Sequence, residues 1–355
     1  MITGSISRSF QQDTAIIANG KQWAVLIAFL AILLLLPHLP LFSSAPVLGL
    51  INGIGVAIIA VTGLQILTGY CGQFSMGPSA LVGVGAYTCA ILTAKWGWGF
   101  MPALLASGFA AALVGFAFGI PSLRVKGFYL ALSTIALQFI FVFLVEHGPH
   151  EVTGNIDGLQ VPTARLPDWL GGMAIDSAEG KYYLILAFVL LGLFLATNLV
   201  RTNAGRAFIV VRDNELAAQA IGVNPFRYKL LAFFISSLYA GVAGALYTQL
   251  SLFIAPGDFT LTTSIWYVAM LITGGMGTIS GVVFGSVLLN VLLFLGPRYG
   301  PQLTSVFPQL SDGAVYAGLN LLLALVIILF LVFQPHGVAH WWKSVSSRFS
   351  RRYLQ

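Results

Sequence analysis

Long stretches without a charged residue constrain this chain more than any other feature. Residues 22–94 contain no Asp, Glu, Lys or Arg over 73 positions. Further uncharged runs cover residues 96–123, 127–145, 182–200, 230–257, 259–297 and 313–334. A membrane-spanning helix needs about 20 mainly apolar residues. Only 8% of the residues are charged and 58% are hydrophobic, whereas a soluble domain carries about a quarter charged residues. We therefore expect an all-α polytopic membrane protein.

The uncharged runs also give the number of spans. The first run divides into three segments, at the prolines of residues 37–40 and at the glycine-rich residues 69–78. The run 259–297 divides into two at residues 274–281, and the remaining runs hold one span each. About ten transmembrane helices result. The first, residues 23–42, is expected to stay attached, because it is too long for a typical signal-peptide core.

Basic residues predict the orientation of these spans. With the N-terminus and C-terminus cytoplasmic, 13 of the 17 Lys and Arg residues fall on the cytoplasmic side, as the positive-inside rule requires. The predicted outer segment 146–181 holds six acids and two bases. The expected organisation is a cytoplasmic N-terminal segment, 1–22, a transmembrane permease domain, 23–335, with a periplasmic loop, 147–181, and a cytoplasmic coupling loop, 201–229, and a basic cytoplasmic tail, 336–355.

The residues that could carry chemistry form no catalytic pattern. No Walker motif is present, so nucleotide hydrolysis would have to occur on another chain. His147 and His150 stand beside acids, but no metal-ligand set recurs elsewhere, and Cys71 and Cys89 are expected to be small buried residues. The spans are nearly free of ionisable residues, which argues against an ion-coupled carrier. We expect no enzyme activity, no metal site and no cofactor on this chain.

Two glycine-rich breaks share the pattern T-G-x-x-G-x-x-S, as TGYCGQFS at residues 68–75 and TGGMGTIS at residues 273–280. Each falls where an inward-running span is predicted to end and an outward-running span to begin. Glycine and hydroxyl residues permit a broken backbone or close helix contact at membrane depth. Either these are tight cytoplasmic turns, or they form part of a translocation path lined by Gly72, Gln73, Ser75, Thr273, Gly277 and Ser280.

The predicted cytoplasmic segment 201–229 is too charged to cross a membrane. Asn214 is suited to cap a short helix that has Glu215 in its first turn, and Gly222 is suited to end it. Pro225 then prevents continuation of that helix. A short amphipathic helix between two spans is typical of a docking element, and the alternative is a solvated loop that only obeys the positive-inside rule.

Several motifs in this order resemble the LivM-like branched-chain amino acid ABC transporter permeases. The resemblance covers about residues 47–335. It rests on residues 69–87, VKGFY at 125–129, TGNIDGL at 153–159, GRAF at 205–208, RDNE at 212–215 and ITGGMGT at 272–278. Permeases of ABC importers carry a docking motif E-A-A-x-x-x-G. Ala217, Ala218 and Gly222 match that spacing, whereas Glu215 lies one position early.

The resemblance implies a binding-protein-dependent importer in the bacterial inner membrane. A periplasmic binding protein would deliver the solute, a second permease subunit would complete the path, and a pair of ATPase subunits would hydrolyse ATP. The ATPase-coupling residues would be Arg206, Arg212, Glu215, Ala217, Ala218 and Gly222. A permease for urea or short amides is an alternative, as is an ATP-independent channel or secondary carrier.

Overall fold

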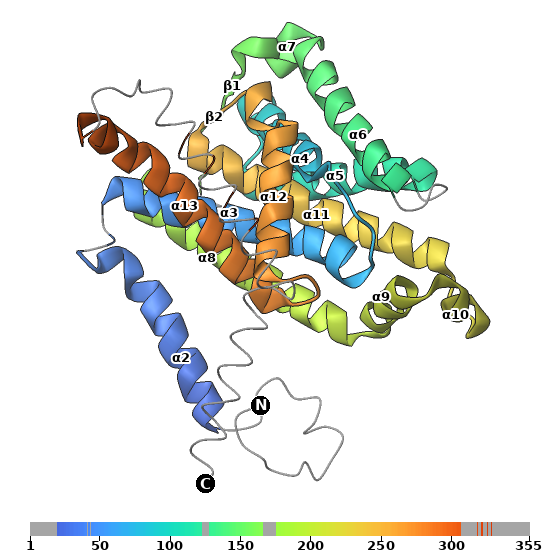
Figure 1. Ribbon diagram of the computed structural model, residues 1–355. Helices are drawn as coiled ribbons and strands as arrows, with labels where there is room; N and C mark the ends of the chain where they lie inside the picture. The colour runs from blue at the N-terminus through green and yellow to red at the C-terminus, as the bar shows by residue number, and fades with distance from the viewer. Residues whose placement is uncertain are drawn as a thin grey trace.

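The chain folds almost entirely into helices in the computed structural model (Figure 1). The structure describes residues 20–40, 42, 44–122, 128–165 and 175–306, and single positions 318, 321, 325 and 328. The predicted cytoplasmic tail, 336–355, nearly all of the N-terminal segment, 1–22, and most of the last predicted span, 313–334, lie outside the described residues. The long helices are α2 (Gly20–Leu35), α3 (Ala45–Leu64), α4 (Pro78–Ala94), α5 (Phe100–Ser122), α6 (Phe128–Glu146), α8 (Ala178–Arg201), α11 (Pro225–Ser251), α12 (Leu261–Gly274) and α13 (Ile279–Val306).

The helices follow the uncharged runs of the sequence. Five of them are long and apolar enough to cross a membrane: Ala45–Tyr70, Phe100–Pro121, Tyr129–Glu146, Ala178–Arg201 and Pro225–Ser251. The helices Pro78–Ala94 and Ile279–Leu295 are shorter but also apolar. Each of the first nine predicted spans coincides with a described helix. The all-α polytopic fold is therefore confirmed, and the count of ten crossings stays a prediction.

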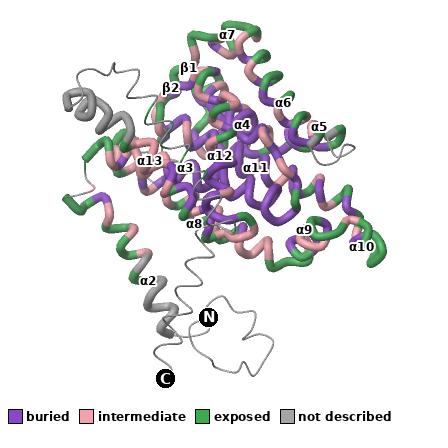
Figure 2. Tube along the Cα trace, in the orientation of Figure 1, coloured by how far each residue is buried: buried purple, intermediate pink, exposed green. Residues whose placement is uncertain are grey.

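Helix α11 lies at the centre of the bundle and packs against α3, α4 and α5. Figure 2 shows that these helices hold much of the buried part of the chain. Small residues allow the close approach: a Cβ on Gly244 would lie 2.0 Å from the carbonyl oxygen of Val82 on α4, and one on Gly241 would lie 2.5 Å from that of Ser107 on α5. Such close packing stabilises helix bundles in a bilayer, where burial of apolar surface gives no driving force.

Two ends of the bundle are separated by the length of α11. At one end lie two short helices, α9 (Asn203–Asp213) and α10 (Glu215–Ala220), which precede α11 in the chain. At the other end the two-residue strands β1 (Leu159–Gln160) and β2 (Phe253–Ile254) pair antiparallel, with Leu159 opposite Ile254. Helix α7 (His150–Thr153) lies beside this pair (Figure 1). The 27 residues of α11 place these ends about 40 Å apart, and we call them the α10 end and the strand end.

Candidate functional site

The first glycine-rich break begins with a change in helix type. Helix α3 continues into a π-helical turn, η2 (Gln65–Tyr70), and α4 begins only at Pro78. Gly72 has φ +72°, a left-handed conformation that glycine adopts without steric cost. Single π-helical turns are frequent at functional sites in helices. The predicted break is therefore confirmed as a break.

The second break separates α12 from α13. Helix α12 ends at Gly274, α13 begins at Ile279, and Gly275 and Gly277 have φ +114° and +80°. A Cβ on Gly274 would lie 2.0 Å from the carbonyl oxygen of Gly281. Only glycines permit the two helices to meet this closely after so short a connection. This break is also confirmed as a break.

The two breaks contact each other, although they are more than 200 residues apart in sequence. The side-chain amide of Gln65 donates hydrogen bonds to the carbonyl oxygens of Thr278 and Gly275, at 2.9 and 3.3 Å. A Cβ on Gly69 would lie 2.9 Å from the backbone nitrogen of Gly277. Gln65 is fully buried. Sequence reasoning missed it, although an amide inside an apolar run is the signal that could have identified it.

Arg212, the penultimate residue of α9, reaches the same place. Its Nη1 donates a 3.0 Å hydrogen bond to the carbonyl oxygen of Gly69. The aliphatic part of its side chain lies so close to Gly72 that a Cβ there would be 2.7 Å from Arg212 Cγ. Nη1 also lies 3.5 Å from the position of a Cβ on Gly277. We call this meeting of Gln65, Arg212 and the two breaks the glycine junction.

Local sequence signals set the limits of α9, which carries Arg212, and of α10, which follows it. The hydroxyl of Thr202 accepts the N–H of Gly205 at the start of α9, and Asn214 Oδ1 accepts the N–H groups of Leu216 and Ala217 at the start of α10, at 2.9 and 3.1 Å. Gly222, with φ +83°, follows the end of α10. The predicted cap and stop of the short helix are confirmed. The segment contains two helices, α9 and α10, where one was expected.

Helix α10 divides into a buried and an exposed side. Ala218 is fully buried within the chain, and Lys229, only 6% exposed, forms an ion pair with Glu215. Ala218 and Glu215 thus contribute to the packing of α10, whereas Ala217 is exposed. The exposed apolar side chains are Leu216 and, directly after the helix, Ile221, 75% and 68% exposed. The predicted coupling residues include neither. Arg206 on α9 is exposed and donates a hydrogen bond to Asn203.

The six residues predicted to line a path lie in different surroundings. Gly72 and Ser280 are exposed and Gly277 is half-buried, and of these Gly72 and Gly277 meet at Arg212. Gln73, Ser75 and Thr273 are buried. Their polar groups have partners nearby in the sequence. The Thr273 hydroxyl donates to the Ala269 carbonyl at 2.8 Å, and the Gln73 amide donates to the Cys71 carbonyl. Ser75 Oγ accepts the N–H of Gly77. A path role for all six stays a prediction.

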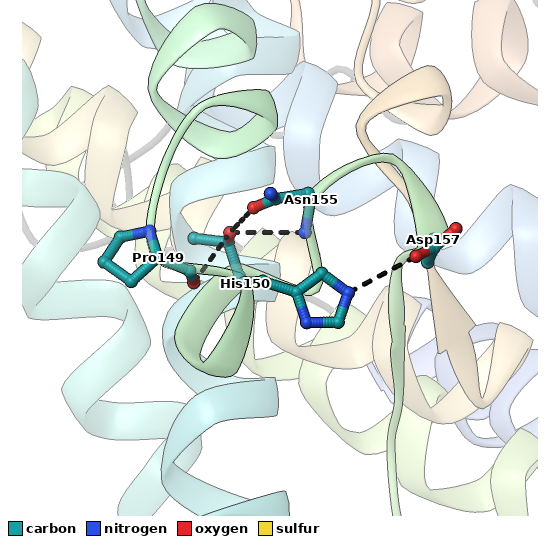
Figure 3. A network of polar contacts seen from close by, with 5 residues as sticks. Pro149, His150, Asn155 and Asp157 are labelled. Atoms are coloured by element: carbon teal, nitrogen blue, oxygen red, sulfur yellow. Dashed lines mark hydrogen bonds and ion pairs between the residues drawn. The ribbon is translucent and has the colours of Figure 1, made fainter.

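The polar residues of the strand end form a small network, in which His150 and Asp157 are exposed and Thr153 and Asn155 are half-buried (Figure 3). His150 Nε2 lies 3.3 Å from Asp157 Oδ2, and the Thr153 hydroxyl donates to Asn155 Oδ1 at 2.9 Å. His147 instead stacks on Phe143, with ring centroids 4.3 Å apart. Among the described residues, His, Cys, Asp and Glu nowhere gather in groups of three that could hold a metal ion. Cys71 and Cys89 are buried, as expected.

Comparison with known proteins identifies the family. Residues 47–333 match the model of the branched-chain amino acid transport system permease component. The chain is 31% identical to the high-affinity branched-chain amino acid transport permease LivM of Escherichia coli, over 80% of this chain and 67% of that protein. It is 25% identical to BraD of Pseudomonas aeruginosa, another high-affinity branched-chain amino acid permease, over 81% of this chain and 94% of that protein.

Other relatives serve a different solute. The autoinducer 2 import permease LsrC of Salmonella choleraesuis is 29% identical over 69% of each chain. No solved structure is a significant match. The family model spans most of the chain, and the relatives are permeases of membrane transport systems. The chain therefore belongs to the LivM-like permease components of branched-chain amino acid ABC transport systems.

Proposed function

We propose that this chain is a permease subunit of a binding-protein-dependent ABC importer in a bacterial inner membrane. It moves branched-chain or related amino acids into the cytoplasm by alternating access. A second permease subunit, a pair of ATPase subunits and a periplasmic binding protein complete the assembly. The family supports the transport role, and ATP binding and hydrolysis belong to the partner subunits, because this chain carries no Walker motif.

The exposed surface of α10 is the observation that carries this proposal. Leu216 projects from α10 at the same end as both breaks, Ile221 follows directly after that helix, and Phe226, 44% exposed, lies at the start of α11. Exposed apolar side chains grouped on a small structured element are typical of a protein contact. The ion pair between Glu215 and the buried Lys229 fixes α10 to α11. We assign this surface to the ATPase subunit.

The two glycine-rich breaks are the elements proposed to move during transport. Broken backbone within a helical membrane protein is tolerated where it is buried in protein or lines a cavity, and transporters bind and release solutes at such places. The polar groups offered there are backbone carbonyls, hydroxyls and amides. They suit a zwitterionic or neutral solute better than an ion.

Uptake by the purified assembly tests the function. The full-length chain with a C-terminal tag is purified in mild detergent from its native membranes, with its associated subunits, and reconstituted into vesicles with the binding protein. We expect uptake of radiolabelled leucine that requires ATP on the side of the ATPase subunits. Uptake without ATP would contradict the proposal, and uptake of radiolabelled urea in place of leucine would assign the solute to the alternative class.

A matched pair of substitutions tests the docking surface. Leu216→Asp places a charge on the exposed face of α10, whereas Ile156→Asp places one at the strand end on a side chain of similar exposure, 76%. We expect Leu216→Asp to lose the ATPase subunit during purification, because desolvating an unpaired charge at a contact is costly, and Ile156→Asp to retain it. Equal retention by both variants would contradict the assignment.

A further inference from the structure

We propose that Arg212 and Gln65 transmit movement of the α9–α10 segment to both glycine-rich breaks, and thereby act as the positioning residues that couple ATP hydrolysis to solute movement. This inference rests on the proposed function and deepens it. Docking alone moves α9 and α10, whereas import requires that the spans re-orient. The glycine junction is where the described structure connects α9 to the two breaks.

Arg212 provides the connection to the first break. Arg212 lies on α9, yet its guanidinium donates a hydrogen bond to the carbonyl oxygen of Gly69 on η2, 143 residues away in sequence. The side chain lies directly against Gly72, where the backbone has a positive φ and a Cβ would meet Arg212 Cγ at 2.7 Å. Because Gly72 has no side chain, Arg212 can reach the carbonyl oxygen of Gly69. The same guanidinium also pairs with Asp213 on α9, so a shift of α9 carries Arg212 with it and changes its contacts with Gly69 and Gly72.

Gln65 provides the connection from the first break to the second. One amide group bonds the carbonyl oxygens of Gly275 and Thr278, which lie at the two ends of the connection between α12 and α13. Its own Oε1 is buried and has no hydrogen-bond partner among the described residues, and it lies against Gly69, where a Cβ would be 2.6 Å away. A buried acceptor without a donor is rare in native structures and needs a reason. Rearrangement of the junction would allow Oε1 to gain a donor.

The remaining contacts of the segment make it move as a unit. Asn214 joins the end of α9 to the start of α10 through its cap, and Glu215 pairs with Lys229 on α11. A displacement of α10 by a bound partner therefore also displaces Arg212, which lies only two residues before Asn214, the cap of that helix. Coupling of this kind needs a contiguous set of packed or hydrogen-bonded groups with two arrangements. Arg212, Gly69, Gln65 and residues 275–278 form a contiguous set of this kind in one arrangement, and transport would require a second.

The test measures the ATP hydrolysed for each leucine imported by the reconstituted assembly. Arg212→Ala removes the first connection, and Gln65→Leu removes the second with little change in volume. We expect both variants to keep the ATPase subunit and to hydrolyse ATP within about twofold of the wild-type rate, while the ATP used per leucine rises about tenfold or more. Arg212→Lys keeps one donor and should fall between. Arg227→Ala, at an exposed arginine at the start of α11, is the control and should keep the wild-type ratio.

Three results would overturn the inference. Wild-type ratios in Arg212→Ala and Gln65→Leu would show that the junction transmits nothing. Loss of the ATPase subunit from Arg212→Ala would place Arg212 in docking instead. Failure of Arg212→Ala, Arg212→Lys and Gln65→Leu all to accumulate in the membrane would assign the junction to folding alone. Failure of the proposed function looks different, because the wild-type assembly itself would then import no leucine with ATP.

Discussion

The two ends of the bundle are held together by different means. At the strand end, segments about 95 residues apart meet through the main-chain pairing of β1 with β2 and through Gln249, whose side chain bonds the Ala164 N–H and the Pro162 carbonyl. The contact of His150 with Asp157 there is exposed. At the α10 end, segments meet through the side chains of Gln65 and Arg212, which reach backbone carbonyls beside glycines. The exposed side chains of the strand end can be replaced at little cost, whereas a Cβ added at Gly72 would collide with Arg212. Substitutions at the glycine junction should therefore matter far more than substitutions at the exposed strand-end residues.

The largest effect is expected at Gly72. Gly72→Val forces a β-branched residue into a left-handed conformation, which costs about 1–2 kcal/mol for ordinary L-residues, and it places a Cβ 2.7 Å from Arg212 Cγ. Overpacking of that kind adds about 1–3 kcal/mol. We expect leucine uptake to be abolished while the variant still reaches the membrane.

Gly277→Val changes the other positive-φ glycine that faces Arg212 in the glycine junction, and it is the variant to compare with Gly72→Val. Its φ is also positive, at +80°, but the nearest atom to its Cβ, Arg212 Nη1, would be 3.5 Å away, an ordinary contact. We expect a strong loss of uptake that is smaller than the loss at Gly72, measured at equal membrane levels. Normal uptake by both variants would reduce the two breaks to plain turns.

A second comparison lies within α10. Ala218→Arg puts a long charged side chain into a fully buried position, whereas Ala217→Arg changes an exposed one. Burying an unpaired charge destabilises the local fold by about 3–5 kcal/mol. We expect Ala218→Arg to insert into the membrane but to lose the ATPase subunit in pull-down, because α10 can no longer pack on the chain. Ala217→Arg should keep more of the ATPase subunit, and equal full binding by both would mean that α10 is a solvated linker.

The smallest effect is expected at the strand end. His150→Ala removes the contact with Asp157, but both side chains are largely exposed, at 67% and 84%. Exposed ion pairs contribute little to stability. We expect an unchanged melting temperature and unchanged uptake, and a loss comparable to that of Gly72→Val would contradict the contrast between the two ends.

Local patterns predicted the elements of the α10 end but not its contacts. Uncharged runs gave the helices, and glycines gave both breaks, because each depends on a short stretch of sequence. Asn214 and Gly222 likewise marked the limits of α10. Arg212 was assigned to docking from its motif, yet its side chain reaches Gly69, and no local pattern contains a contact between residues 143 positions apart.

Burial of individual side chains was the other feature that local sequence did not predict. Lys229 belongs to the predicted cytoplasmic loop 201–229, where a basic residue is expected to be exposed, but it is buried beside Glu215. Ala217 and Ala218 are identical neighbours, and only the packing of α10 decides that one is exposed and the other buried. Gln65 was hidden within an apolar run because its hydrogen-bond partners lie in the other break. Tertiary contacts decide all three cases.

Accessibility of single cysteines tests the central claim that the two ends face opposite sides of the membrane and that the α10 end responds to ATP. Met276, in the second break, and Ile156, at the strand end, are 54% and 76% exposed, and the native Cys71 and Cys89 are buried. With a membrane-impermeant maleimide, we expect Met276→Cys to react only from the cytoplasmic side, at a rate that ATP changes, and Ile156→Cys to react only from outside, at a rate independent of ATP. Reaction of both from the same side, or a Met276→Cys rate unaffected by ATP in an assembly that imports leucine, would contradict the account.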